Sequence, residues 1–325
     1  MSVNINGCSR FQMGCDTTSR CRGVALVTVL FILFLLTTLS VYLIDDQYLS
    51  IRRIANQRDS EQTFQMAVGA EQWAAKILER DMRDNETDHL EEPWNELLPA
   101  VPVEEGTLAT EVVDAQGLFN LNNLQAGRDN VWYPAFVRLL RVLELEEGLA
   151  DAVVDWIDAD VDVTGNFGAE DGEYLSKDPP YRAANRLFAE VGELQWVEGF
   201  DLQAVTVIAP FVSALPATNV RINVNTAVLP VLQILGETAL SEPQAQALIE
   251  ARGEEGFSDT QDFLVLPELA GQANIAGPLI TISSEYFSVH SRALFGRVNL
   301  TLDSVIYRRP SDQIAVVLRR RRSLS

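Results

Sequence analysis

The sequence VALVTVLFILFLLTTLSVYLI, Val24–Ile44, contains 21 residues and no charge. At about 1.5 Å of rise per residue, one helix of this length crosses the ~30 Å hydrocarbon layer of a bilayer. Arg10, Arg20 and Arg22 precede the stretch, and two aspartates at 45–46 follow it. Because basic flanks stay in the cytoplasm, we expect one membrane-spanning helix, with the remainder of the chain on the outer side.

The segment before the apolar stretch is short and basic, and it ends in Gly23. An ordinary secretory signal is cleaved after its apolar segment, which is then lost. Cleavage after Gly23 would instead keep the apolar helix, and Val24 would become the first residue. Two interpretations follow: a single-pass anchor with a short cytoplasmic tail, or a prepilin-like leader that is removed after Gly23.

Composition limits the classes of function. The 325 residues are enough for one or two domains with buried cores. The formal net charge of -21 argues against a nucleic-acid partner and favours cations or positively charged partners. Only two histidines are present, which leaves little room for histidine-based catalysis. Cys8, Cys15 and Cys21 all precede Gly23, so a chain beginning at Val24 would have no disulfide.

The helical pattern continues beyond the apolar stretch. From Asp45 to about Asp84 there is no Pro and only one Gly, and apolar or small residues recur near helical spacing. We predict one helix from Val24 to about Asp84, ~90 Å long, whose second half packs one stripe on a globular domain. The alternative is a membrane helix joined by a linker to a separate helix. The absence of a helix breaker between Ile44 and Gln57 disfavours that alternative.

Two regions with strand-like patterns flank a helical region. Residues 85–106 are acidic, contain three Pro and predict a loop, and Thr107–Leu124 predicts a hairpin. Tyr286–Ala293 and Arg297–Tyr307 predict a second hairpin. Between about residues 131 and 270 we expect short amphipathic helices, including one near Ala183–Phe188. Because an isolated hairpin is only marginally stable, we expect one sheet with a helical domain inserted into it.

The densest group of carboxylates lies between Glu144 and Glu173, which span 11 Asp or Glu and no Lys or Arg. The centre of the group is DWIDADVDVTGNFGAEDGEY, and its candidate ligands are Asp155, Asp158, Asp160, Asp162, Glu170 and Asp171. These charges repel one another strongly unless a cation lies among them. Oxygen ligands without a nearby His or Cys favour calcium over zinc or copper.

The spacing of the acidic loop matches an EF-hand only in part. Asp158, Asp160 and Asp162 occupy positions one, three and five, but Val163 replaces the Gly and Ala169 replaces the bidentate Glu. Glu170 and Asp171 remain candidates to close the site with another geometry. A solvated acidic loop is the alternative, and a paired-carboxylate glycosidase site is disfavoured because no single acid stands out.

A second motif is INVNTA, Ile222–Ala227, which is followed by helices and by EPQAQALIEARGEEGFSDTQDFL. This order resembles the helix-hairpin-helix units of DNA-binding proteins, and we expect Asn225 or Thr226 to cap a helix that starts at Ala227. DNA-binding hairpins use a Gly-rich turn with Lys or Arg beside it. The corresponding GETALSEP is acidic with a single Gly, so the unit is predicted to be a structural or protein-contact scaffold.

Four stretches together resemble one protein family. They are RGVALVTVL at Arg22–Leu30, DWIDAD…GAEDGEY…DPPYRAANR at Asp155–Arg186, ELQWVEGFD at Glu193–Asp201 and INVNTA. In this order they look like minor pseudopilin K of the type II secretion system (general secretion pathway protein K), over Arg22 to about Tyr307. The resemblance implies an α+β, pilin-like fold. Its long N-terminal helix, transmembrane in the first half, packs on an antiparallel sheet with a large inserted α-helical domain.

The resemblance also implies a division of the chain. Residues 1–23 would be the prepilin leader, 24–44 the transmembrane half of the helix, and 45–126 the periplasmic helix with the first strands. Residues 127–277 would form the inserted α-domain, with the acidic calcium loop and the helix-hairpin-helix-like unit at about 222–266. Residues 278–325 would form the last strands and a basic tail containing Arg319–Arg322.

Processing and partners follow from the same resemblance. A prepilin peptidase would cut after Gly23 and methylate the amine of Val24, leaving a single-pass inner-membrane protein with most of its chain in the periplasm. The protein would form the tip of the pseudopilus with minor pseudopilins I and J, contact the inner-membrane secretion platform and help initiate assembly for export of folded proteins. Family members bind calcium at the acidic loop, so the six carboxylates named above would hold one or two ions.

Thr28 bears on position within the filament. Most pilin-like proteins have Glu at the fifth mature position, where it pairs with the N-terminal amine of a neighbouring subunit. Counting from Val24, the fifth residue is Thr28. A subunit without that Glu need not engage a subunit above it, which suits the terminal position; the alternative is that Thr28 is merely a tolerated small residue.

Three functional hypotheses belong to different classes. The first is a non-enzymatic assembly component, the membrane-anchored pseudopilin at the tip. The second is a membrane-tethered, calcium-dependent periplasmic hydrolase, which would need a nucleophile or base held by an orienting partner. The third is a DNA-uptake factor, which would need a basic face. The sequence shows no such catalytic constellation, and only the Arg run at the tail offers a basic face, so the first hypothesis is favoured.

Overall fold

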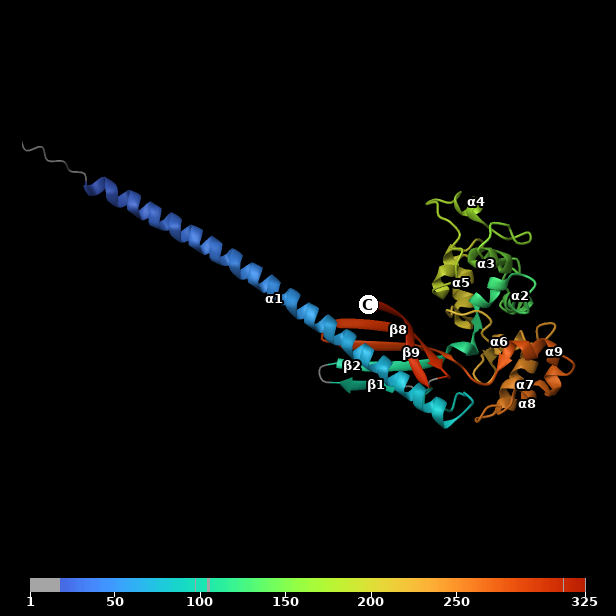
Figure 1. Ribbon diagram of the computed structural model, residues 1–325. Coiled ribbons are helices and arrows are strands. Elements are labelled where there is room, and N and C mark those ends of the chain that lie inside the picture. The colour runs from blue at the N-terminus through green and yellow to red at the C-terminus, as the bar shows by residue number, and fades with distance from the viewer. Residues whose placement is uncertain (1–17, 97, 104–105, 312, 325) are drawn as a thin grey trace, which may run out of the picture. The chain divides into compact units, whose positions relative to one another are not determined.

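The computed structural model describes residues 18–96, 98–103, 106–311 and 313–324, so residues 1–17 of the predicted leader, with Cys8 and Cys15, lie outside the described residues. The chain divides into two compact units, one up to Asp59 and one comprising Ser60–Ser325. A single helix, α1 (Thr18–Asp84), runs through 67 residues, as Figure 1 shows in blue and cyan. The prediction of one helix without a linker is therefore confirmed.

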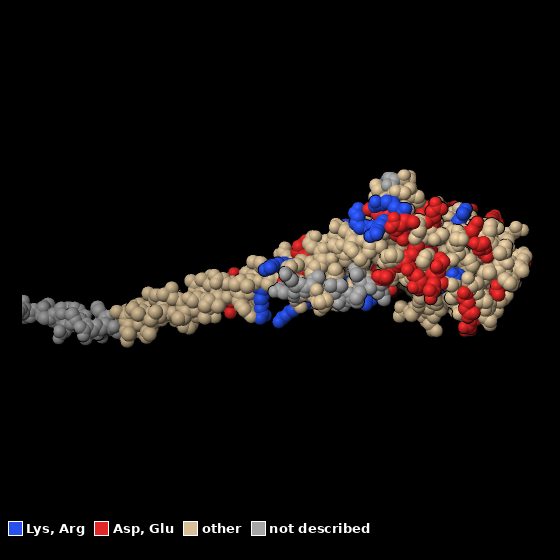
Figure 2. Space-filling view, turned by 90° about the horizontal axis from the view of Figure 1, so that it is seen from below, with Lys and Arg blue, Asp and Glu red and all other residues tan. Residues whose placement is uncertain are grey.

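In the first unit, the apolar side chains of Val24–Ile44 are exposed. Within the described residues, α1 is the one helix long and apolar enough to cross a membrane, and none of its most apolar segment is buried. Figure 2 shows this half of α1 without Lys, Arg, Asp or Glu side chains. Exposed apolar residues on all sides of a helix are expected when lipid surrounds it.

The second unit contains a five-stranded antiparallel sheet in the order β1-β2-β7-β8-β9. Its strands are β1 (Leu98–Val103), β2 (Gly106–Asp114), β7 (Tyr286–Phe295), β8 (Val298–Arg309) and β9 (Ile314–Leu324). Strands β2 and β7 are neighbours although most of the chain separates them. Residues 115–285 therefore form an insertion between adjacent strands, which is wider than the 127–277 expected from the sequence.

The second half of α1 packs on one face of this sheet. Ala74 and Leu78 are buried against Phe287, Val289 and Ile306. About two turns before Ala74, Ala67 lies in a cluster with residues of β7 and β8, namely Ala293, Leu300 and Leu302. Small alanines on α1 let the helix approach the sheet closely, and alternation in the strands presents one apolar face to it.

The first predicted hairpin, Thr107–Leu124, is wrong. β2 pairs with β7 and with β1, and β1 itself lies in the segment predicted to be a loop. After Asp114 the chain forms two short 3₁₀ turns around β3 (Phe119–Asn120), which pairs in parallel with β4 (Val212–Ser213). The Asn residues of LFNLNNL are buried, and Asn122 donates to the carbonyls of Phe188 and Leu215 at 3.0 and 2.7 Å. The alternation of apolar and Asn residues here therefore reflects hydrogen bonds from buried Asn side chains to distant segments, and not a strand with one face in solvent.

The insertion is built from short helices around one large core. They are α2 (Trp132–Val142), α3 (Leu149–Ile157), α4 (Asp171–Tyr174), α5 (Leu202–Ile208), α6 (Leu229–Gln233), α7 (Glu242–Arg252), α8 (Thr260–Leu264) and α9 (Ala273–Ala276), with a two-stranded parallel pair β5 (Ile222–Asn223) and β6 (Ile280–Thr281). Phe119, Phe136 and Leu139 are fully buried in this core. The helix predicted near Ala183–Phe188 is absent from that described segment, which is irregular.

The C-terminal Arg run is a strand of the sheet. Arg319–Arg322 lie in β9, so alternate members point to opposite faces. On the α1 face, Arg320 donates to Glu71 at 2.8 Å and Arg322 donates to Ser60 at 2.7 Å. On the other face, Arg321 forms an ion pair with Glu190 of the insertion. The predicted basic tail is thus an edge strand that binds both α1 and the helical insertion.

Candidate metal centre

The acidic loop begins where α3 ends. The residues of α3 are buried throughout, and the helix terminates at Asp158, whose N–H donates to the Val154 carbonyl at 3.0 Å. The chain then turns through 159–170 and enters α4 at Asp171. Since α3 packs in the main core, its last turn gives the loop a rigid origin.

Three of the predicted ligands converge. Asp158, Asp160 and Glu170 each offer a carboxylate oxygen, and these oxygens all lie within 4.8 Å of one another. Asp158 Oδ1 and both carboxylate oxygens of Glu170 are buried without any hydrogen-bond partner among the described residues. A buried carboxylate without a partner costs several kcal/mol in general, so it is retained only where a cation or a proton compensates.

The electrostatic environment of the cluster is unfavourable for bare carboxylates. Burial, with further repulsion from Asp160 and Asp155, raises the pKa of Asp158 to about 6. Burial, with repulsion from Asp155 and Asp158, raises the pKa of Glu170 to about 7. A divalent cation bound to these oxygens would offset both causes, because its positive charge favours the ionised carboxylates. The arrangement is therefore suited to a hard cation that prefers oxygen ligands.

Asp155 lies beside the cluster and shapes the loop. It is fully buried, and its two carboxylate oxygens accept the Thr164 N–H at 3.0 and 3.1 Å. Burial raises its pKa. A Cβ atom at Gly168 would collide with the Asp155 carboxylate and with the Thr164 carbonyl, so the close return of the loop requires a glycine there. Asp155 holds the loop closed and adds negative charge next to Asp158 and Glu170.

The other two predicted ligands lie outside this cluster. Asp162 is exposed, and its N–H donates to Asp160 Oδ1 at 2.9 Å. Asp171 forms an ion pair with Arg182 at 2.8 Å and accepts the Ala183 N–H at 3.2 Å. The structure therefore brings together Asp155, Asp158, Asp160 and Glu170, while Asp162 is displaced toward solvent and Asp171 is neutralised by an arginine of PYRAAN.

A second acidic cluster, which is buried throughout, was not predicted from the sequence. Asp81, Asp88 and Glu92 are buried, and their oxygens also lie within 4.8 Å of one another. Here Arg308 of β8 supplies the cation, with 2.7 Å to Asp81 and 2.6 Å to Asp88. Glu92 accepts a hydrogen bond from Asn85 at 2.6 Å and one from the Trp94 indole. The single signal in the sequence is a pair of Arg residues at the end of a strand, which does not identify the partners of Arg308.

The INVNTA motif fastens the insertion to the sheet. Asn223 donates to the Asp88 carbonyl at 3.1 Å and to Asp114 at 3.0 Å, and Thr226 donates to Asp114 at 2.6 Å. Asn225 exchanges two hydrogen bonds with the backbone of Phe257. The predicted capping role of Asn225 or Thr226 is wrong, because α6 begins at Leu229 after Val228 and both polar side chains are used for these longer-range contacts.

Comparisons with known proteins agree on one family. Family models described as type II secretion system (T2SS), protein K, match residues 117–217 and 222–283. Type II secretion system protein K of Pseudomonas aeruginosa is 36% identical over 313 residues, which cover 91% of this chain and 92% of the relative. The chain belongs to the type II secretion system protein K family. The Aeromonas hydrophila protein K is 30% identical over 92% of this chain and 96% of its own length.

A solved structure confirms the fold of this protein K family member. One chain in the crystal structure of the GspK-GspI-GspJ complex from enterotoxigenic Escherichia coli matches with a TM-score of 0.76 at 28% identity. The match covers 84% of this chain and all of that chain. The resemblance seen in the sequence is therefore confirmed, as is the α+β, pilin-like fold. Membership of the protein K family makes the chain a minor pseudopilin, a structural component of type II secretion.

Proposed function

We propose that this minor pseudopilin forms the tip of the periplasmic pseudopilus together with minor pseudopilins I and J. The observation that carries this proposal is the match to a chain of the GspK-GspI-GspJ complex, in which that relative is assembled with two other subunits. The tip complex helps initiate the pseudopilus on the inner-membrane platform. Growth of the pseudopilus then supports export of folded proteins across the outer membrane.

The insertion supports a terminal position. It occupies residues 115–285, between two adjacent strands of a sheet that is itself covered by α1 on one face. In a filament, repeated subunits stack through their long helices at short axial spacing. A helical domain of this size at every level would obstruct such stacking, whereas a single copy at the end meets no neighbour above it.

Processing after Gly23 would give α1 a free end in the membrane. In the proposal, a prepilin peptidase cuts there on the cytoplasmic side and methylates Val24, and the exposed apolar side chains of Val24–Ile44 hold the chain in the inner membrane. The part after Ile44 lies in the periplasm, because the basic flank remains cytoplasmic. The pseudopilus is then built from mature chains of this kind.

Thr28 is accommodated without a partner subunit. Its hydroxyl donates to the Ala25 carbonyl at 2.9 Å, so its hydrogen-bonding capacity is used within the helix. A Glu at this position would instead be a buried carboxylate in lipid and would demand a cationic partner. A subunit with Thr28 at this position therefore needs no subunit above it, which suits the end of the filament.

The acidic loop is proposed to hold calcium. Asp158, Asp160 and Glu170 would bind one ion through their carboxylates, and Asp155 beside them adds negative charge. The fit rests on the three buried oxygens that lack partners and on a donor set composed of oxygen alone. Calcium there would supply no chemistry beyond charge neutralisation. It would order the loop between α3 and α4, and no catalytic step is assigned to the chain.

Co-purification tests the proposed assembly. The full chain carrying an affinity tag is expressed with minor pseudopilins I and J and their peptidase, solubilised in detergent and isolated. We expect I and J to be recovered with it in fixed proportion, and labelled antibody to mark one end of isolated pseudopili. Recovery without I and J, or label along the whole filament, would overturn the tip assignment.

A further inference from the structure

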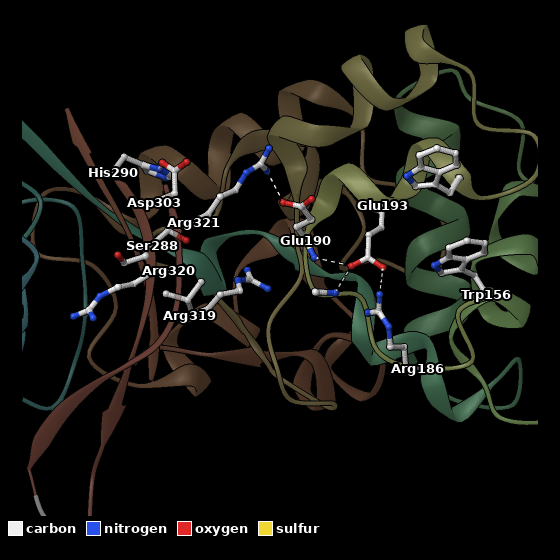
Figure 3. A pocket seen from close by; sticks show the side chains of 14 residues that line it. Trp156, Arg186, Glu190, Glu193, Ser288, His290, Asp303, Arg319, Arg320 and Arg321 are labelled. Carbon is white, nitrogen blue, oxygen red and sulfur yellow. Dashed lines mark hydrogen bonds and ion pairs between the residues drawn. The ribbon is translucent and has the colours of Figure 1, made fainter. Parts of the chain in front are cut away.

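A cavity of about 690 Å³ lies between the sheet and the helical insertion. Its sheet side is the face opposite α1, formed by β7, β8 and β9, and its other side is formed by Trp156 and the segment from Arg186 to Trp196 (Figure 3). The Asn185 N–H donates to the Trp156 carbonyl at 3.0 Å and fixes that segment against α3. Nothing in the proposed assembly role uses this cavity.

Most charges in the cavity are paired. Arg186 lies 3.1 Å from Glu193, His290 lies 2.8 Å from Asp303, and Arg321 pairs with Glu190. Arg320 is bonded to Glu71 on the opposite face. These pairs account for every carboxylate among the described residues that line the cavity.

Arg319 is the exception among the cavity arginines. Its side chain lines the cavity, is half-buried and makes no hydrogen bond or ion pair with any described residue. Burial lowers the pKa of its guanidinium, although an arginine stays charged at any physiological pH. A partly desolvated guanidinium with five free donors is a strong site for a carboxylate, which it can bind through two parallel hydrogen bonds.

A second donor in the same cavity also lacks a partner. Trp156 is 5% exposed, and its indole Nε1 is buried without an acceptor among the described residues. Figure 3 shows this nitrogen on the side of the ring that faces Glu193 and the interior of the cavity. Its ring is held edge-on against Tyr174 and Tyr181, so the donor cannot turn away easily. Buried donors are normally bonded, so the arrangement indicates an absent acceptor.

The edge of the sheet favours a peptide as the source of these acceptors. β9 is the last strand in the order, and no described strand pairs with its other edge. An extended segment can add to such an edge through backbone hydrogen bonds, with alternate side chains directed into pockets on one face. A nucleic-acid phosphate could also bind Arg319, but nucleic acid has no backbone N–H and C=O groups that pair with the edge of a strand.

We propose that this cavity binds an extended acidic segment of a partner protein. One carboxylate of the segment lies on Arg319, another acceptor takes the Trp156 N–H, and an apolar side chain packs on Trp196, which is 47% exposed. The Arg321–Glu190 pair at the rim sets the width of the entrance. The assignment does not depend on the tip position, because it uses only contacts within this chain.

A binding assay on the full mature chain in detergent tests the proposal. The probe is a fluorescein-labelled peptide of nine residues with blocked ends, in which Glu alternates with Val and Phe, and its matched control has Gln in place of Glu. We expect saturable binding of the Glu peptide alone. Arg319→Gln should weaken it at least about tenfold, which corresponds to one charged hydrogen bond. Trp156→Phe, which keeps the ring and removes the N–H, should weaken it severalfold.

Controls separate the cavity from general attraction to charge. Arg297→Gln removes an exposed Arg from the turn between β7 and β8 and should leave binding unchanged. If Arg319→Gln lowers the melting temperature, Arg319→Lys keeps the charge, loses the planar fork and should give an intermediate affinity. Equal binding of the Glu and Gln peptides, or equal losses for Arg319→Gln and Arg297→Gln, would overturn the proposal. Either result would leave the co-purification with I and J unaffected.

Discussion

The two acidic clusters have similar composition and opposite electrostatics, and they differ in burial: the first is buried throughout, whereas Asp160 of the second is exposed. Asp81, Asp88 and Glu92 surround Arg308, whose guanidinium reaches two of them and the Ser284 carbonyl. Asp158, Asp160 and Glu170 have no Lys or Arg among them, and three of their oxygens are buried without partners. The first cluster carries its own cation, which the fold delivers from a distant strand. For the second, we propose that the cation comes from solution.

The first cluster is therefore an internal ion-pair network that joins α1, the loop after it and β8. Arg308 lies on β8, Asp81 at the end of α1 and Asp88 in the following loop, and all three are buried. Asp114 lies next to this network and accepts hydrogen bonds from the side chains of Thr226, Ser284 and Asn223. The network connects the long helix, the sheet and the insertion, so we expect its loss to affect the whole second unit.

The largest expected effect comes from removing the internal cation. Arg308→Met leaves Asp81 and Asp88 buried without their partner, which costs about 3–5 kcal/mol in comparable buried ion pairs. Denaturant unfolding of the full chain in detergent should show this loss, and added calcium should not restore it. Arg297→Met, at an exposed position, is the matched control. A decrease of less than ~1 kcal/mol in the free energy of unfolding would mean that the Arg308 ion pairs do not stabilise the fold.

Removal of calcium should have the next largest effect. An ion present at 100 times its Kd stabilises the state that binds it by about 2.7 kcal/mol, so chelation should lower the midpoint of thermal unfolding. Glu170→Gln should abolish the difference between the calcium and chelator samples. Asp171→Asn should retain it, because Asp171 is paired with Arg182 outside the cluster. Equal midpoints with calcium and with chelator would reject the metal site.

The pH dependence sharpens the contrast further. In the metal-free chain the pKa values of Asp158 and Glu170 are raised to about 6 and about 7, so folding favours their protonated forms. The resulting stabilisation is complete below their unfolded pKa values and is lost as pH rises through 6 to 7. The increase in melting temperature on adding calcium should therefore be larger near pH 8 than near pH 5. Asp88, whose pKa is also raised to about 7, contributes equally with and without calcium.

The smallest expected effect concerns the loop residue nearest the EF-hand pattern. Asp162 is exposed and lies outside the cluster, so Asp162→Asn should change the stability of the calcium-loaded chain by no more than ~0.5 kcal/mol. Asp160→Asn, which removes a converging carboxylate charge, should reduce calcium affinity clearly more. A larger loss of calcium affinity at Asp162 than at Asp160 would contradict this assignment and would favour ligands at the EF-hand positions.

Local patterns predicted the features that depend on local physics. The uninterrupted helix through Asp84 follows from the lack of breakers, and the β7–β8 hairpin follows from alternation around Gly296. The density of carboxylates pointed to the loop where Asp158 and Glu170 meet. In each case neighbouring residues in the sequence carry the signal, and the tertiary structure does not override it.

Features that depend on contacts between residues far apart in the sequence could not be predicted. Arg308 and Asp88 are 220 residues apart, so their ion pair has no local signature. The pattern around Asn122 suggested a returning strand, but its side chain is bonded to carbonyls 66 and 93 residues away. The Arg run in β9 could not be divided between two faces until its strand register was known. Polar residues that hold separate segments together look like solvent-facing residues in the sequence.

Calcium bound per folded chain tests the central claim most directly. Equilibrium dialysis of the full mature chain against labelled calcium, at neutral pH and physiological salt, measures it without relying on stability or assembly. We predict at least one bound ion for the native chain and for Asp171→Asn, and none at the loop for Glu170→Gln. A native chain that binds no calcium, or a Glu170→Gln chain that binds as much as the native one, would contradict it.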